Sequence, residues 1–523
     1  MQTSLARAPR TLHVSHLLDA LLSWRGVLVY WSANALVFGL ARYSVSRTLA
    51  LDEARTVEMA QEFAAGYTAR QPPLYDQASW LLAQLLGPGA PSHLVLRFVC
   101  IALIGLLTFA AVARATGQER SAAAASLSLS FHYFFGWYHH QWGTHTLVLC
   151  MAALWSFVAL IDFAERPGGA RALLLGAAIG LGLVSKFSFL LFLAGLFGAA
   201  LTLPDLRRAA QSPWIVAAGV VALAVCAPYL IWLASVHADV LGTVQTHLVQ
   251  TRQSHLVRAL VGLGLLLWSL VAFTMPWAAI IAALVPRAFD PRVRRDVPPT
   301  LGERLAARTT VIAAALAAAG IVAAGATNVG ERYMHPLLVL APVIVFGRLA
   351  GVDGTAPKLR LVAGAAVSAA VVLVALRLAL PTIDNLTQKT VRTANLPFEA
   401  LAAQMAARGY DHGTALATDV REAGNLRSFL PRLRVVADVD SHRAVRTPPR
   451  PDAQGKCFAV ARLFTAQQGQ ISAGDVAGRF ETNALEPLGN EPLVLEVRVG
   501  SGRGARRLYW GILDLRPESA ACR

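Results

Sequence analysis

The chain has 523 residues, of which 55% are hydrophobic and only 15% are charged. Soluble domains carry roughly 25% charged residues, so this composition excludes an ordinary soluble protein and indicates an integral membrane protein. The net charge of +16 does not indicate nucleic-acid binding, because the arginines are spread over short loops between apolar segments, as membrane topology predicts.

Apolar segments that could span a bilayer follow one another through most of the chain. A span takes about 20 residues. Eleven segments are candidates: 26–46, 94–113, 121–136, 144–164, 172–185, 187–203, 214–234, 259–285, 309–326, 335–350 and 359–380. The fifth and sixth are short and nearly continuous, and the tenth is also short. With the N-terminus in the cytoplasm, the inner segments carry 18 Lys and Arg residues and the outer loops seven. This bias supports the orientation and predicts that the C-terminal part lies outside the cytoplasm.

The C-terminal part, 382–523, has a different pattern. The stretches "GTALATD", "RLRVVADVD", "CFAVARLF", "PLVLEVRV" and "RRLYWGILDLR" predict strands, and "REAGNLRSFL" predicts a helix. We therefore expect a transmembrane module at 1–381, with a long first outer loop at 47–93, and a small outer α/β domain at 382–523. Cys457 and Cys522 lie in this domain; they form either a disulfide or two free thiols.

Polar residues that could take part in catalysis or binding lie mostly in the predicted outer loops. Asp52 and Glu53 directly follow the first apolar segment, and a helix is expected over 51–67. Pro72 and Pro73 interrupt it before an amphipathic stretch over 80–86. Ionisable residues at membrane depth are costly and are usually functional. The candidates are Asp52, Glu53, Gln71, Tyr75, His139, His140, His145, Lys186, Arg252, His255, Glu331, Arg332 and Tyr333. For the histidines, ordinary loop positions are the favoured interpretation.

The stretches "LDEA", "GY…QPPLY…WL", "GLGLVSKFSFLL" and "GERYMHPLLVLAP" resemble segments of the bacterial family 39 glycosyltransferases. This group has the GT-C fold and includes the aminoarabinose transferase of lipid A and the protein O-mannosyltransferases. "THTLVL" after "HHQW" looks most like a rhizobial branch that attaches galacturonic acid to lipopolysaccharide. The resemblance covers about residues 26–350. It implies a helical GT-C-like bundle in the bacterial inner membrane, with its active site at the outer, periplasmic face.

By this resemblance the donor is a sugar on a polyprenyl phosphate, and the acceptor is lipopolysaccharide, lipid A or another envelope glycan. Asp52 matches the catalytic acidic residue of the family, and Glu53 matches the second acid of the pair. Relatives often have Lys before the two prolines, where it helps to hold the donor phosphate; the neutral Gln71 stands there in this chain. Because Gln71 carries no charge, other residues are needed to bind the donor phosphate. The substrate-binding candidates are Lys186, Arg332, Tyr333, Gln71, Tyr75, Arg252, His140 and His145.

The chemistry of transfer fits one carboxylate and several cations. A carboxylate can take the proton of an acceptor hydroxyl as the new C–O bond forms, and a phosphate leaving group needs only cations to stabilise its charge. We therefore expect Asp52 to be the general base, with inversion at the anomeric carbon. Glu53 either orients the acceptor or supports the base, or it faces away, because adjacent helical residues point about 100° apart.

No cofactor is required by this scheme. The histidines at 139, 140 and 145 could bind a divalent metal, but we do not predict one. The alternative function is a lipid or sugar transporter or flippase, which would place polar residues near the middle of several spans. Only Arg97 and His132 stand out as such residues in the sequence.

Overall fold

The computed structural model describes residues 10–237, 239–240, 242, 245, 248–249, 253–290, 298–349, 352, 354–387, 395–437, 456–463, 493–499 and 506–516. The chain forms two compact units that are not contiguous in sequence. The helical unit comprises Met1–Val37, Arg70–Pro72 and Phe98–Val374. The mixed unit comprises Phe38–Ala69, Pro73–Arg97 and Ala375–Arg523. Most of the first loop and the C-terminal sheet therefore belong to the same compact unit.

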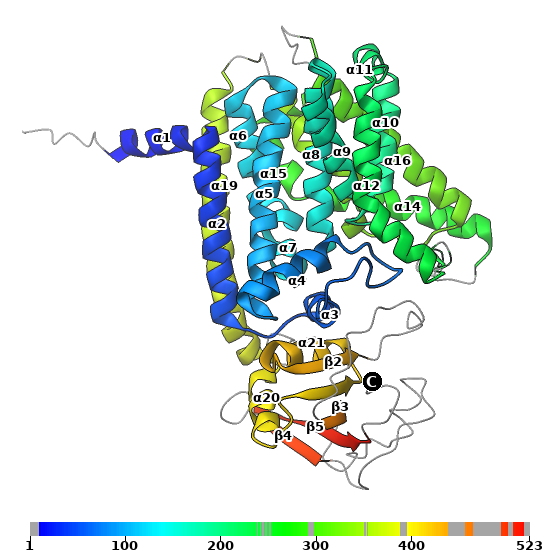
Figure 1. Ribbon diagram of the computed structural model, residues 1–523. Coiled ribbons are helices and arrows are strands. Elements are labelled where there is room, and N and C mark those ends of the chain that lie inside the picture. Colours follow the sequence, from blue (N-terminus) through cyan, green and yellow to red (C-terminus); the bar gives the residue numbers. More distant parts are fainter. Residues whose placement is uncertain are drawn as a thin grey trace, which may run out of the picture. The chain divides into compact units, whose positions relative to one another are not determined.

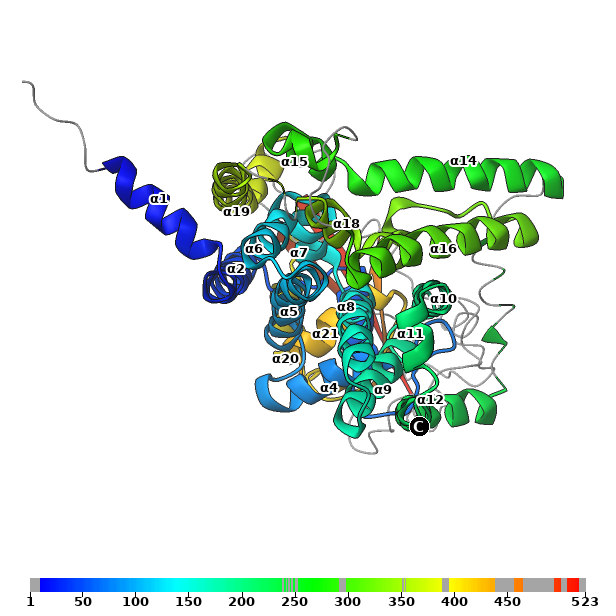
Figure 2. The same ribbon diagram turned by 90° about the horizontal axis from the view of Figure 1, so that it is seen from above.

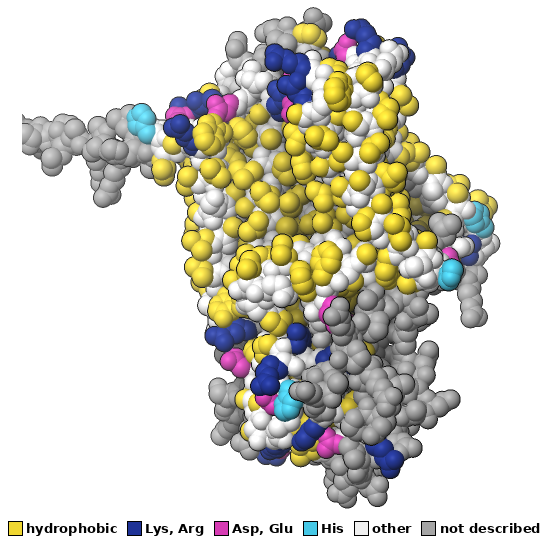
Figure 3. All heavy atoms as spheres, viewed as in Figure 1, with side chains coloured by type: hydrophobic (Ala, Val, Ile, Leu, Met, Phe, Trp, Pro, Cys, Tyr) yellow, Lys and Arg dark blue, Asp and Glu magenta, His cyan; other side chains and the backbone are white. Residues whose placement is uncertain are grey.

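Long apolar helices dominate the chain (Figure 1). Within the described ranges, six are long and apolar enough to cross a membrane: α5 (Ala90–Thr116), α8 (His145–Glu165), α12 (Trp214–Ser235), α14 (His255–Thr274), α16 (Leu301–Ala324) and α19 (Ala356–Thr387). Figure 3 shows hydrophobic side chains covering the helices of the helical unit, with Lys and Arg side chains gathered at the end where α11 (Pro204–Ala209) lies. The chain is thus an α-helical multi-pass membrane protein, as its composition predicted.

Further helices complete the helical part of the chain. They are α1 (Arg10–Leu21), α2 (Trp24–Val45), α6 (Glu119–Ser128), α7 (His139–Trp142), α9 (Gly169–Leu183), α10 (Phe189–Leu201), α15 (Trp277–Leu284), α17 (His335–Leu338) and α18 (Ala341–Gly347), with 3-10 turns at Leu129–Phe131, Pro286–Ala288 and Glu331–Tyr333 and a π-helical turn at Tyr133–Tyr138.

Every predicted apolar segment contains helix, but three of them are not single continuous helices. The segment 259–285 is divided into α14 and α15 at Pro276, because proline lacks the N–H that a helix needs. The segment 121–136 is α6 followed by 3-10 and π-helical turns, and 335–350 consists of the short helices α17 and α18. The total of eleven spans stays a prediction.

Small residues set the spacing of the helices in the helical unit. Helix α9 packs on α12, and α10 packs on α16, as the view along the bundle shows (Figure 2). A Cβ at Gly176 of α9 would lie 2.4 Å from the carbonyl oxygen of Ala218 on α12. Small residues at such contacts let the helix backbones approach closely, which favours helix association in lipid.

The C-terminal part of the mixed unit is built on a five-stranded sheet, as the sequence predicted. Its strands are β1 (Gly413–Ala417), β2 (Leu433–Ala437), β3 (Lys456–Leu463), β4 (Leu493–Val499) and β5 (Arg506–Leu515), in the order β2-β1-β3-β5-β4. Strand β1 runs parallel to β2 and β3, whereas β5 runs antiparallel to β3 and β4. Strand β1, with the apolar sequence "GTALA", lies between β2 and β3 and is buried along its whole length.

Two helices supply the other half of this core. Phe398 of α20 (Phe398–Ala406) and Leu426 of α21 (Val420–Phe429) join Phe458 and Trp510 of the sheet in one buried cluster. The predicted helix over 421–430 is therefore confirmed. Cys457 is disulfide-bonded, which favours the disulfide over a free thiol at this position, whereas Cys522 lies outside the described residues.

The first-loop part of the mixed unit contains α3 (Leu51–Met59) and α4 (Leu74–Leu86). The helix expected over 51–67 ends early, at Met59, because the backbone then turns and the Tyr67 hydroxyl accepts from Ala64 N–H and donates to Glu62 C=O. Helix α4 exposes apolar side chains, with Leu81 59% and Leu85 75% exposed. This pattern agrees with the predicted amphipathic stretch.

Candidate functional site

The acidic pair sits in the first turn of α3, and its two side chains have opposite environments. Asp52 is exposed, whereas Glu53 is completely buried. Glu53 Oε2 accepts a hydrogen bond from the Ala50 N–H at 2.6 Å, which satisfies one of the free amides at the start of the helix. Of the roles left open for Glu53, the structure supports the one in which it faces away from Asp52 and from solvent.

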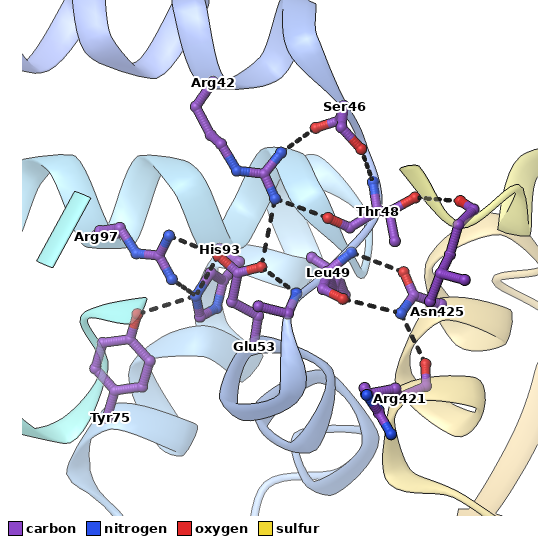
Figure 4. Close-up of polar contacts among 12 residues, drawn as sticks. Arg42, Ser46, Thr48, Leu49, Glu53, Tyr75, His93, Arg97, Arg421 and Asn425 are labelled. Atoms are coloured by element: carbon purple, nitrogen blue, oxygen red, sulfur yellow. Dashed lines mark hydrogen bonds and ion pairs between the residues drawn. The ribbon is translucent and has the colours of Figure 1, made fainter. Parts of the chain in front are cut away.

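Glu53 lies in a buried ion-pair cluster (Figure 4). Its Oε1 atom is 2.5 Å from Arg97 Nη1, and its Oε2 atom is 3.5 Å from Arg42 Nη2. Burial by itself raises the pKa of Glu53, but the positive charges of Arg97 and Arg42 outweigh burial and lower the pKa to about 2. Glu53 is therefore a carboxylate at every physiological pH and is unsuited to exchange protons during a reaction.

The arginines of this cluster also organise the neighbouring backbone. Arg42 donates to the carbonyl oxygens of Ser46 and Thr48, the latter at 2.7 Å. Arg97 Nη2 lies 3.0 Å from His93 Nε2, and a guanidinium can only donate in such a contact. The cluster thus fixes the end of α2, the start of α3 and the first turns of α5 to one another.

Tyr75 belongs to the same cluster. Its side chain is completely buried, and its hydroxyl lies 3.5 Å from His93 Nε2. Tyr75, a predicted substrate contact, therefore lies next to His93 in the buried cluster around Glu53. Its role as a substrate residue stays a prediction.

Arg55 shares a face of α3 with Asp52, because residues three apart on a helix are neighbours. The Nε atom of Arg55 is buried and has no hydrogen-bond partner among the described residues. A guanidinium on the same face as an exposed carboxylate can hold an anion close to that carboxylate. Nothing in the sequence distinguishes Arg55 from the other arginines of the predicted outer loops.

The predicted phosphate-binding residues lie in the helical unit. Lys186 is half-buried, and its Nζ atom donates to Thr146 Oγ1 at 2.9 Å. Arg332 is exposed, and its Nη2 atom donates to the hydroxyl of its neighbour Tyr333 at 2.8 Å. Gln71, also in the helical unit, is half-buried. Arg252, the other predicted cation, lies outside the described residues.

The histidines of the second loop are buried and not solvent-facing. His139, His140 and His145 are all at most 8% exposed. His335 Nδ1 donates to the Arg332 carbonyl at 2.9 Å, so its Nε2 atom accepts from His139 Nε2, 2.8 Å away. This chain of bonds fixes the turn that carries Arg332. No group of three or more His, Cys, Asp or Glu residues in the described part of the chain is arranged to hold a metal ion.

Sequence reasoning missed the partners of Glu53. Arg97 stood out as a charge inside an apolar segment, and such a charge requires a buried counter-ion. Arg42 lies near the end of another apolar helix, and His93 precedes Arg97 by one helical turn. Charged residues at these positions indicate buried ion pairs. The sequence does not show that residues 42, 53 and 97 pair with one another, because that depends on which helices are in contact.

Comparisons with known proteins bear on the family and the fold of the chain. Residues 70–232 match the family described as dolichyl-phosphate-mannose-protein mannosyltransferase. The chain is 28% identical over 464 residues to the lipopolysaccharide core galacturonosyltransferase RgtA of Rhizobium johnstonii, covering 88% of each protein. It is 25% identical over 477 residues to RgtB of the same organism, covering 90% of this chain and 93% of that protein.

Among solved structures, ArnT from Cupriavidus metallidurans bound to undecaprenyl phosphate matches with a TM-score of 0.53 and 15% identity, over 94% of this chain and 98% of that one. The apo state of ArnT matches with a TM-score of 0.52. These likenesses confirm the fold predicted from the sequence. The comparisons favour an enzyme over a transporter and identify the chain as a GT-C membrane glycosyltransferase similar to those of family 39.

Proposed function

We propose that the chain transfers a sugar from a polyprenyl-phosphate donor to a lipopolysaccharide or other envelope glycan at the periplasmic face of the bacterial inner membrane. Galacturonic acid is the candidate sugar, because RgtA and RgtB are named as galacturonosyltransferases. The observation that carries the proposal is the division of roles on α3: Asp52 is exposed, while Glu53 is buried among arginines.

In this mechanism the Asp52 carboxylate removes the proton of the acceptor hydroxyl while the acceptor oxygen bonds to the anomeric carbon. The bond between that carbon and the phosphate oxygen breaks, and the electron pair leaves with the polyprenyl phosphate. Attack from the face opposite the phosphate inverts the anomeric configuration.

Cations are needed where the leaving phosphate gains charge. Arg55 is the candidate nearest to Asp52 in sequence, and Lys186, Arg332 and Tyr333 are the candidates in the helical unit. The proposed substrate-binding residues also include Arg252, Gln71, His140 and His145, which we propose from the sequence alone. The predicted absence of a metal also stays part of the proposal.

The test is turnover by the purified chain in lipid. We expect sugar transfer from undecaprenyl-phosphate galacturonic acid to a lipopolysaccharide core acceptor, with an inverted linkage in the product by NMR. Mass spectrometry of envelope glycans from cells with and without the gene should show the same sugar missing. An unchanged glycan profile together with no transfer in vitro would contradict the proposal.

A further inference from the structure

The segment before the acidic helix is hydrogen-bonded by a side chain of the C-terminal domain. Asn425 of α21 is completely buried. Its Oδ1 atom accepts from the Leu49 N–H at 2.7 Å, and its Nδ2 atom donates to the Leu49 carbonyl at 3.1 Å (Figure 4). Leu49 lies in the irregular segment 46–50, outside any helix or strand. A buried peptide group of this kind needs such partners, so one amide side chain completes the hydrogen bonding just ahead of Asp52.

A matching contact follows the end of the same helix. The side-chain amide of Gln61 bonds to both backbone groups of Val435 on β2: Oε1 accepts from the N–H at 3.0 Å, and Nε2 donates to the carbonyl at 2.7 Å. Glu58 Oε1 accepts from the Ala437 N–H at 3.2 Å. Strand β2 is at the edge of the sheet, where backbone groups lack strand partners. The first loop supplies these partners.

Between these two contacts, α3 and α21 touch backbone to backbone. A Cβ placed on Gly424 would lie 2.1 Å from the carbonyl oxygen and 2.4 Å from the Cα of Ala54. Both of these Ala54 atoms belong to the backbone and cannot move aside cheaply. The absence of a side chain at Gly424 therefore sets the distance between the two helices, while Asn425 and Gln61 set their register.

We propose that Asn425 and Gln61 are positioning residues, and that the C-terminal domain serves to hold α3 so that Asp52 meets the acceptor hydroxyl. This inference rests on the proposed function. Glu53 fixes one side of the first turn of α3 and Asn425 fixes the segment before it, while the Asp52 side chain itself remains exposed. Misplacing a reacting group by about 1 Å costs up to about 100-fold in rate.

The experiment compares two near-isosteric variants with a control. Asn425→Leu and Gln61→Met each keep side-chain size but remove the two hydrogen bonds to Leu49 and to Val435, respectively. Each also removes one bond within its own segment, from Asn425 to the Arg421 carbonyl and from Gln61 to the Glu58 carbonyl. Arg421→Ala is the control, because it lies on the same helix and its side chain bonds to Asp419. Each protein is tested for turnover with undecaprenyl-phosphate galacturonic acid, for binding stoichiometry with undecaprenyl phosphate, and for hydrogen–deuterium exchange of the α3 amides.

We expect the two variants to lose about 10- to 100-fold in kcat per binding-competent molecule, to keep the donor KM within about twofold, and to exchange the α3 amides faster. The control should match the wild type. If kcat per competent molecule is unchanged, or if the α3 amides exchange as slowly as in the wild type, the proposal is wrong. Should Asn425→Leu not fold, Gln61→Met, at a half-buried position, still decides the question.

The proposed function and this inference can fail separately. If the wild-type protein transfers no sugar, the proposed function is wrong. The exchange of the α3 amides then still decides whether Asn425 and Gln61 hold the helix.

Discussion

Glu53 Oε1 lies 2.5 Å from Arg97 Nη1, and neither side chain is exposed to solvent. A buried pair of this kind gives little net stability compared with apolar residues, but losing one partner leaves a charge buried alone. The pair therefore holds α3 against α5, because separating the two charges would cost a large free energy of desolvation. It also explains why two adjacent acids have opposite environments, with Glu53 buried and Asp52 exposed.

The first prediction concerns Asp52. Asp52→Asn should lower kcat by about 100- to 10,000-fold, because the amide cannot accept the proton of the acceptor hydroxyl. Donor binding and thermal stability should remain as in the wild type, since the side chain is exposed. Steady-state turnover and thermal melting of the purified protein provide the measurements. Near-normal turnover would rule out Asp52 as the base.

The second prediction concerns Glu53. Glu53→Gln should destabilise the protein by about 3 to 5 kcal/mol, because it leaves buried arginine charge without a counter-ion. The matched control is Glu165→Gln, which removes a carboxylate that pairs with Arg114 at the surface and should cost at most about 1 kcal/mol. Denaturation of the solubilised protein measures both. Equal effects of the two substitutions would contradict the role of the buried cluster.

The third prediction follows from the pKa of Glu53. Folding lowers this pKa from the ordinary value of 4.5 to about 2, so the unfolded chain binds more protons between these values. The stabilisation is present above pH 4.5 and is lost as the pH falls toward 2. The stability difference between the wild type and Glu53→Gln should therefore shrink across this window. Melting curves between pH 6 and pH 2.5 test it; a constant difference would contradict the prediction.

The fourth prediction concerns Glu422 in the C-terminal domain. Burial, together with the charge of Asp419, raises the pKa of Glu422 to about 8. The folded protein then holds a proton that the unfolded chain releases above pH 4.5, so stability falls as the pH rises from 4.5 to 8. Glu422→Gln should remove this slope and stabilise the domain at pH 8. Melting midpoints of both proteins from pH 5 to pH 9 provide the measurement, and parallel curves would refute it.

The fifth prediction concerns the leaving phosphate. Arg55→Ala, Lys186→Ala and Arg332→Ala should each weaken binding of undecaprenyl phosphate, by about 10-fold for the loss of one charge-assisted hydrogen bond. Arg171→Ala, at a predicted cytoplasmic loop, is the control. Binding titrations in detergent measure the effect. Normal affinity in all three variants would place the phosphate site elsewhere.

The sequence by itself determined the class of protein and much of the local structure. Apolar runs close to the length that a bilayer requires indicate membrane helices. The predicted stretches also marked the first residues of β1 to β5 and of α21 to within one residue. The motif around Asp52 marked the acidic helix and the family it resembles. These signals are local, because each depends on residues close together in the chain.

The tertiary structure decided which residues act together. It alone showed that Glu53 faces Arg42 and Arg97, and that Asn425, more than 370 residues along the chain, completes the hydrogen bonds of Leu49. It also showed that the helix predicted to reach residue 67 ends at Met59, where Gln61 instead bonds to β2. A local pattern specifies what an element buries, but the identity of its partner depends on how distant segments pack, which no single stretch of sequence contains.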